Sequence, residues 1–182
     1  MTMADQFFTA LSTLAGGAIA ITGALLTNRS NTARLKIQLD HDAALRTSEV
    51  FRDRGEELYV LMEKWLKILA SEYVKLSSVM QGKITYAEFQ DLYLEDAEQN
   101  KIEFPRIELL VDIYYSSTRK AYDEIMASRA KLQKISSAHK RAYERRETNG
   151  RQFLEPYIEA QRAVEAAGEV FKAEITKAIR GV

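Results

Sequence analysis

Few side chains in this 182-residue sequence could carry acid–base or metal chemistry, because it contains no cysteine and only two histidines, His41 and His139. His41 lies seven positions after Arg34, and seven steps along an α-helix return to nearly the same face. The arginine could stabilise a phosphate and the histidine could shuttle a proton, if two chains brought their copies together. Arg34 and His41 are therefore candidate catalytic residues.

This spacing resembles the arginine–histidine motif of helical ribonucleases of the HEPN superfamily, in which four to six residues separate the two side chains. The resemblance implies one alternative function, a ribonuclease that uses Arg34 and His41 as catalytic residues. The pair departs from that motif because Leu35 stands where a polar residue usually follows the arginine. A juxtamembrane Arg34 and a surface His41 explain the two residues more simply. We therefore expect no enzyme, no cofactor and no metal site, since the absence of cysteine also excludes zinc–cysteine sites and thiol catalysis.

The N-terminal segment predicts a membrane helix. No charged residue lies between Asp5 and Arg29, and residues 7–27 have the length that spans a hydrocarbon core of about 30 Å. A cleaved signal peptide would need basic residues before this run. Arg29, Arg34 and Lys36 follow it and no lysine or arginine precedes it, which predicts an external N-terminus and a cytoplasmic C-terminal domain in a bacterial inner membrane.

One face of the predicted membrane helix carries small or hydroxylated residues. Such a face lets helix backbones approach closely, which favours self-association in a bilayer. In a larger ring the same face could line a water-filled pore. The candidate oligomer-facing or pore-facing residues are Thr9, Thr13, Gly16, Ala20, Gly23, Ala24 and Thr27.

The rest of the chain predicts an all-α protein. With 8 glycines and 2 prolines, and with apolar residues at spacings of three and four, residues 32–81 form one long helix. Thr85 and Glu88 match a capping box that starts a short helix ending near 98. A third helix is expected from Pro105 towards Asn149–Gly150, and a last one from about 154–156 to Gly181. The predicted domains are a membrane segment, 1–31, and a cytoplasmic bundle, 32–182, of three to four long antiparallel helices.

Charge is unevenly distributed along the predicted bundle. Residues 129–146 are basic and residues 88–103 are acidic, and a single returning helix from Pro105 would place these two segments at opposite ends. The basic end would lie near the lipid headgroups, whereas the acidic distal end could bind a basic protein partner. Nucleic acid is not the expected partner, since Tyr143 is the one aromatic residue among these basic side chains. The candidate headgroup-binding or anion-binding residues are Arg29, Arg34, Lys36, Lys140, Arg141, Arg145 and Arg146.

The layout as a whole is similar to the small single-pass accessory proteins of type VI-B CRISPR loci. That resemblance implies a homo-oligomeric membrane-pore effector of antiviral defence, in which the Arg34 and His41 pair is vestigial. Three functions follow as expectations: the pore effector, a membrane-tethered ribonuclease, and a non-enzymatic anchor or docking module for a protein partner.

Overall fold

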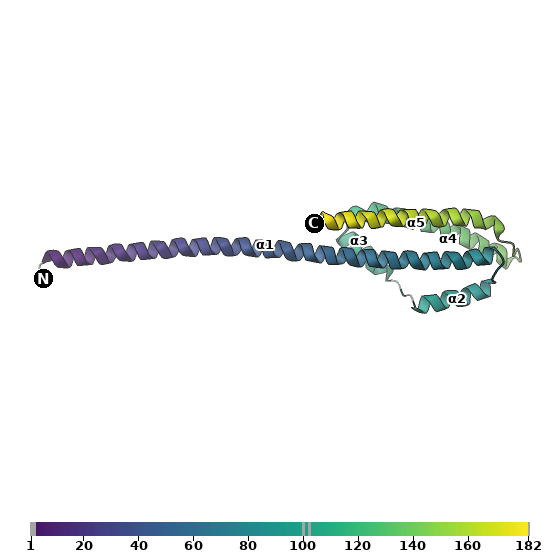
Figure 1. Ribbon diagram of the computed structural model, residues 1–182, viewed down its shortest axis with the longest axis horizontal. Coiled ribbons are helices and arrows are strands. Elements are labelled where there is room, and N and C mark those ends of the chain that lie inside the picture. Colours follow the sequence, from purple (N-terminus) through teal and green to yellow (C-terminus); the bar gives the residue numbers. More distant parts are fainter. Residues whose placement is uncertain (1–2, 100, 102, 182) are drawn as a thin grey trace. The chain divides into compact units, whose positions relative to one another are not determined.

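A computed structural model describes the backbone of residues 3–99, 101 and 103–181, and the surroundings of the side chains at 17, 23, 24, 26–96, 98, 101 and 103–181. Within these residues the chain is all-helical, as the sequence predicts, with five α-helices, one short 3-10 helix and no strand. The helices are α1 (Met3–Met80), α2 (Tyr86–Gln99), α3 (Phe104–Ile113), α4 (Arg119–Glu144) and α5 (Arg151–Arg180), with η1 (Ser116–Thr118) between α3 and α4 (Figure 1). Contacts divide the chain into two units, Met1–Glu49 and Val50–Val182.

The core of the second unit follows the apolar stripe of α1. Leu58, Met62, Trp65, Leu69 and Leu76 recur at spacings of three, four and seven residues, and all are buried. Trp65 and Leu58 belong to a larger cluster with residues of α3, α4 and α5, whereas Leu76 belongs to a smaller cluster near the end of α1. The stripe predicted on the long helix is thus confirmed.

The start of α2 is fixed by the predicted capping box. The Thr85 backbone N–H donates to Glu88 Oε2 at 2.7 Å, and the Glu88 N–H donates to Thr85 Oγ1 at 3.2 Å. These two bonds satisfy helix-end N–H groups that have no intrahelical acceptor. No described residue of α2 is fully buried. Tyr86 and Phe89 pack against the smaller core cluster, and Asp96 pairs with Lys75 of α1.

The single third helix predicted from Pro105 is wrong, because the chain turns at residues 114–118. The Tyr115 side chain is buried and its hydroxyl donates to the Phe51 carbonyl, while Thr118 Oγ1 donates to the Tyr115 carbonyl at 2.8 Å. Consecutive serine and threonine side chains compete for backbone hydrogen bonds and so favour a turn over a continuous helix. The turn reverses the chain and separates α3 from α4.

This turn also corrects the predicted placement of charge. Trp65 lies against Phe104 at the start of α3 and against Arg129 within α4. Tyr86 at the start of α2 packs edge to face against Tyr143 near the end of α4. Helix α4 therefore runs parallel to the second half of α1, not antiparallel. The basic C-terminal turns of α4 and the beginning of the acidic segment lie at the same end of the bundle, not at opposite ends.

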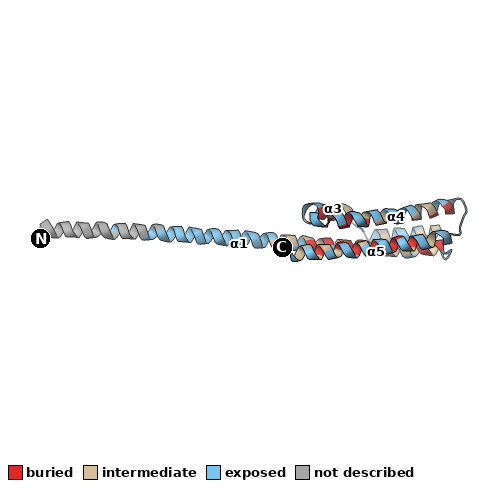
Figure 2. Cartoon of the chain, turned by 90° about the horizontal axis from the view of Figure 1, so that it is seen from above, coloured by how far each residue is buried: buried red, intermediate tan, exposed pale blue. Residues whose placement is uncertain are grey.

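The last helix returns along α1. Tyr157 stacks on Tyr73 with ring centroids 5.3 Å apart, and Figure 1 shows α5 beside the second half of α1. Figure 2 shows buried and exposed positions alternating along α5, as expected of a helix with one face on the core. Helix α5 begins at Arg151, a few residues earlier than predicted, with Pro156 inside it.

The predicted localisation needs correction. The predicted span, residues 7–27, lies largely outside the residues whose side chains are described. In the part of the chain that is described, no helix combines the length and the apolarity that crossing a membrane requires. The prediction of a single-pass membrane protein with a cytoplasmic C-terminal domain is therefore wrong.

Candidate interaction surfaces

A cleft opens between α1, α2 and α4, beside the middle of the bundle. It consists of two adjoining cavities of about 250 Å³ each, which share Leu69, Glu72, Tyr93 and Arg129. The first cavity has an aromatic and aliphatic wall, and the second is lined by polar side chains. The first is completed by Trp65, Ile68, Lys75, Asp96, Lys101 and Phe104, and the second by Leu132, Gln133, Ser136, Ser137 and Tyr157.

Arg129 lies where the two cavities meet. Its guanidinium carbon is 5.9 Å from the centre of the Trp65 ring and 5.4 Å from that of Phe104, distances at which a cation is attracted to an aromatic face. The side chain is half-buried, yet it forms no hydrogen bond or ion pair with any residue that the structure describes. The two rings therefore hold a guanidinium whose N–H donors are directed to no protein acceptor in the described region.

The acidic groups of the cleft differ from one another. Asp96 pairs with the Lys75 ammonium and accepts a hydrogen bond from Ser71 Oγ at 3.0 Å, which lowers the pKa of Asp96. Glu72 is half-buried without such a pair in the described residues, and burial raises the pKa of Glu72 although Arg129 opposes the shift. In the cleft, the charge of Asp96 is thus neutralised by Lys75, whereas Glu72 has no paired cation among the described residues.

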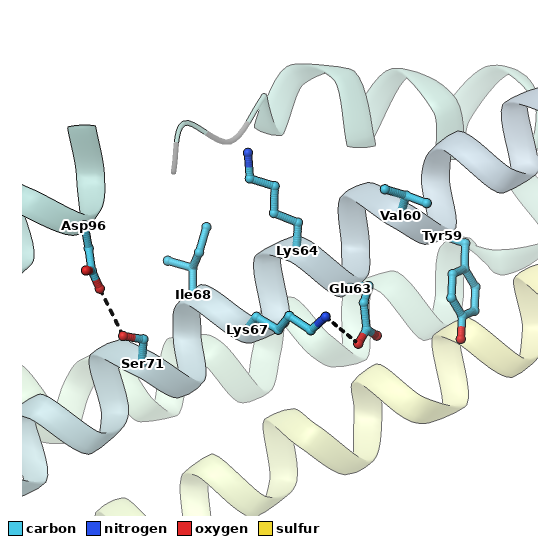
Figure 3. Close-up of a pocket in the computed structure, with 8 residues that line it drawn as sticks. All are labelled: Tyr59, Val60, Glu63, Lys64, Lys67, Ile68, Ser71 and Asp96. Carbon is cyan, nitrogen blue, oxygen red and sulfur yellow. Dashed lines mark hydrogen bonds and ion pairs between the residues drawn. The ribbon is translucent and has the colours of Figure 1, made fainter. Parts of the chain in front are cut away.

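A second groove, of about 470 Å³, runs along the outer side of α1 (Figure 3). Glu63 is paired with Lys67 at 3.6 Å and with Lys172 of α5 at 2.8 Å. Lys64 donates to the Lys101 carbonyl at 3.1 Å. These contacts satisfy most of the charges around the groove internally, so it offers a ligand fewer free polar groups than the cleft at Arg129 does.

The first unit presents a different surface. Along residues 26–49 of α1 every side chain is exposed except the half-buried Ser48, as the pale blue helix in Figure 2 shows. Large apolar side chains are among them: Leu35 is 56% exposed, Ile37 69% and Leu39 59%. Since most helical stability comes from packing of an apolar face, an unpacked helix of this length is expected to need a partner.

Arg34 and His41 lie within this exposed segment. Both side chains are exposed, and no described cavity includes either of them. Seven residues of helix separate their Cα atoms by about 10 Å along the axis. The structure therefore places the pair on one face without bringing the two side chains into contact.

The other predicted site residues are also on the surface or outside the description. Thr9, Thr13, Gly16 and Ala20 lie outside the residues whose side chains are described, whereas Gly23, Ala24 and Thr27 are exposed. Two residues of the acidic segment 88–103 have structural partners: Glu88 accepts hydrogen bonds in the capping box, and Asp96 forms an ion pair with Lys75. The basic candidates are all exposed, and Arg145 pairs with Glu147 at 3.0 Å. These basic residues are Arg29, Arg34, Lys36, Lys140, Arg141, Arg145 and Arg146.

Sequence reasoning assigned no role to His139, which closes one end of the bundle. The imidazole is fully buried, its Nδ1 lies 3.0 Å from Tyr86 Oη, and its Nε2 has no hydrogen-bond partner among the described residues. Burial raises the pKa of Tyr86 to about 12, so the phenol beside the imidazole stays neutral. Burial lowers the pKa of His139, because no described acidic group compensates a charge there.

We expect mild acid to destabilise the bundle through His139. In the unfolded chain the imidazole titrates near pH 6.5, but in the folded chain its pKa is lower, so below about pH 6.5 the unfolded state binds more protons. Unfolding in urea should show a free energy that is constant above that pH. Below it the free energy should fall by up to about 1.4 kcal/mol per pH unit. The matched variant His139→Phe should lose this dependence between pH 7.5 and 5.5. An equal pH dependence of the free energy of unfolding in both proteins would show that His139 is not the group responsible.

Among the described residues no cluster of histidine or acidic side chains has the arrangement of a metal site. Comparisons with protein-family models, with curated proteins and with solved structures find no match to this chain, so nothing links it to the CRISPR accessory proteins that its layout resembles.

Proposed function

We propose that the protein is a non-enzymatic helical scaffold that associates with a second copy of itself through residues 26–49 of α1. The observation that supports this is the apolar side of an otherwise uncovered helix. Leu35, Leu39 and Ala43 follow one another at spacings of four residues, so they lie on one side of the helix, and all three are exposed. Burying them against another helix removes apolar surface from water.

Charge favours a second copy in the antiparallel direction. The first half of the segment carries Arg29, Arg34 and Lys36 and no acidic residue, whereas the second half carries Asp40, Asp42 and Glu49 against the single Arg46. An antiparallel pair centred near Leu39 brings the basic half of each copy alongside the acidic half of the other. A parallel pair in register would instead place like charges side by side, which disfavours it.

The absence of native cysteine allows a direct test by disulfide trapping. A Leu39→Cys variant is expected to form a covalent dimer efficiently under mild oxidation, because the two copies of residue 39 meet at the centre of the pair. The matched control is His41→Cys, two residues away on nearly the opposite side of the helix, which should remain monomeric. Leu35→Cys should cross-link poorly alone but well when mixed with Ala43→Cys.

Analytical ultracentrifugation of the unmodified protein provides a second test of self-association. A concentration-dependent dimer is expected, and Leu39→Asp should weaken it at least tenfold, since it places two carboxylates at the centre of the interface. Ile37→Asp, on another side of the same helix, should not. A monomer at all concentrations, or equal trapping at residues 39 and 41, would refute the proposal.

A further inference from the structure

The cleft between α1, α2 and α4 lies in the second unit and has no part in the proposed self-association. We propose that it binds a small amphipathic organic anion, whose apolar body packs in the aromatic cavity and whose carboxylate, sulfonate or phosphate group pairs with Arg129. Shape, charge and the state of Arg129 each support this chemistry.

The apolar part of the ligand is specified by the first cavity. Trp65, Phe104 and Tyr93 contribute aromatic surface from α1, α3 and α2, and Leu69 and Ile68 contribute aliphatic surface from α1. Small-molecule sites are typically apolar cavities with a few polar groups that fix orientation. The adjoining cavity supplies such groups, among them Gln133, Ser136 and Ser137.

The anionic part is specified by the free charges. Asp96 is neutralised by Lys75, which leaves Lys101 and Arg129 against Glu72 around the cleft. Arg129 is already oriented by the two aromatic rings, so binding an anion requires little further ordering of its side chain. A guanidinium with unoccupied N–H donors binds oxyanions through two parallel hydrogen bonds, which are stronger than those between neutral groups.

The chain itself supplies the reporter, because Trp65 is its one tryptophan. The probe is 8-anilinonaphthalene-1-sulfonate, which joins an aromatic body to a sulfonate. We expect saturable quenching of Trp65 emission together with a rise in probe emission. The uncharged analogue N-phenyl-1-naphthylamine should bind more weakly, and its binding should not depend on Arg129.

The decisive variant is Arg129→Met, which keeps an unbranched, flexible side chain and removes the guanidinium with its charge. Its affinity for the sulfonate probe should fall at least tenfold. The control Lys131→Met, an exposed position two residues along α4, should bind as the unmodified chain does. Circular dichroism of both variants shows whether the bundle is intact. Equal affinity of the two variants, or the absence of saturable quenching in the unmodified protein, would overturn the proposal.

If Arg129→Met fails to fold, a substitution of Glu72 tests the proposal instead. The charged and titratable groups that line the cleft with Glu72 are Lys75 from α1, Tyr93 and Asp96 from α2, Lys101 from the segment before α3, Arg129 from α4 and Tyr157 from α5. A Glu72 carboxylate beside Arg129 competes with an incoming anion. Glu72→Gln should therefore bind the sulfonate probe several-fold more tightly at neutral pH, and weaker or unchanged binding would count against an anion site. In the unmodified chain, affinity should rise as pH falls towards the raised pKa of Glu72, as long as circular dichroism shows a folded bundle.

Discussion

Replacing Phe171 with alanine is expected to lower the free energy of unfolding by about 3 to 5 kcal/mol. The Phe171 side chain is 0% exposed and lies in the larger core cluster, where its ring centre is 5.9 Å from that of Tyr122 on α4. Truncation removes the transfer free energy of the ring and leaves a cavity among α1, α4 and α5 that neighbouring helices can fill only in part. Urea unfolding of the full chain, followed by circular dichroism, measures the change.

The matched control for Phe171→Ala is the preceding residue in the same helix. Val170 is 51% exposed, so Val170→Ala should change the free energy of unfolding by no more than about 0.5 kcal/mol. Comparable losses at the two positions would mean that α5 does not present this face to the core.

Adding a single methyl group at Gly150 is expected to destabilise the protein by about 1 to 3 kcal/mol. A Cβ atom there would lie 2.5 Å from His139 Nε2 and 2.6 Å from the Met80 Cα atom. The backbone φ of Gly150 is −89°, which alanine adopts readily, so the expected cost of Gly150→Ala is steric and not conformational. Because one obstacle is the backbone of α1, the end of the bundle must shift to admit the methyl group.

Gly181→Ala is the control for Gly150→Ala. At Gly181 a Cβ atom would meet its nearest neighbour, the Ala178 carbonyl oxygen, at 3.6 Å, and φ is −87°. Thermal unfolding should give nearly equal midpoints for Gly181→Ala and the unmodified chain, with Gly150→Ala clearly lower. A Gly150→Ala protein as stable as the unmodified chain would show that α5 does not start against α1.

The two histidines illustrate how far single residues could be interpreted from sequence. His41 drew attention because of its spacing from Arg34, but it lies on an exposed helix away from any described cavity. His139 had no suggestive neighbour in the sequence, yet Tyr86, Tyr143 and Phe153 surround it with aromatic rings. Tyr143 follows His139 by four residues on α4, but Tyr86 comes from α2 and Phe153 from α5, and no local spacing reports that these two meet His139.

The helical class, the core stripe of α1 and the capping box at Thr85 and Glu88 were determined by the sequence itself. Each depends on interactions between residues three or four positions apart, which the helical period brings together in any surroundings. Only the tertiary structure decided three other features: the contact of Arg129 with the Trp65 and Phe104 rings, the turn at Tyr115, and the direction of α4. Tyr115 ends α3 because its hydroxyl reaches the Phe51 carbonyl, 64 residues away in the chain. Such contacts depend on how helices pack against each other, and they set both the placement of charge and the shape of the cleft.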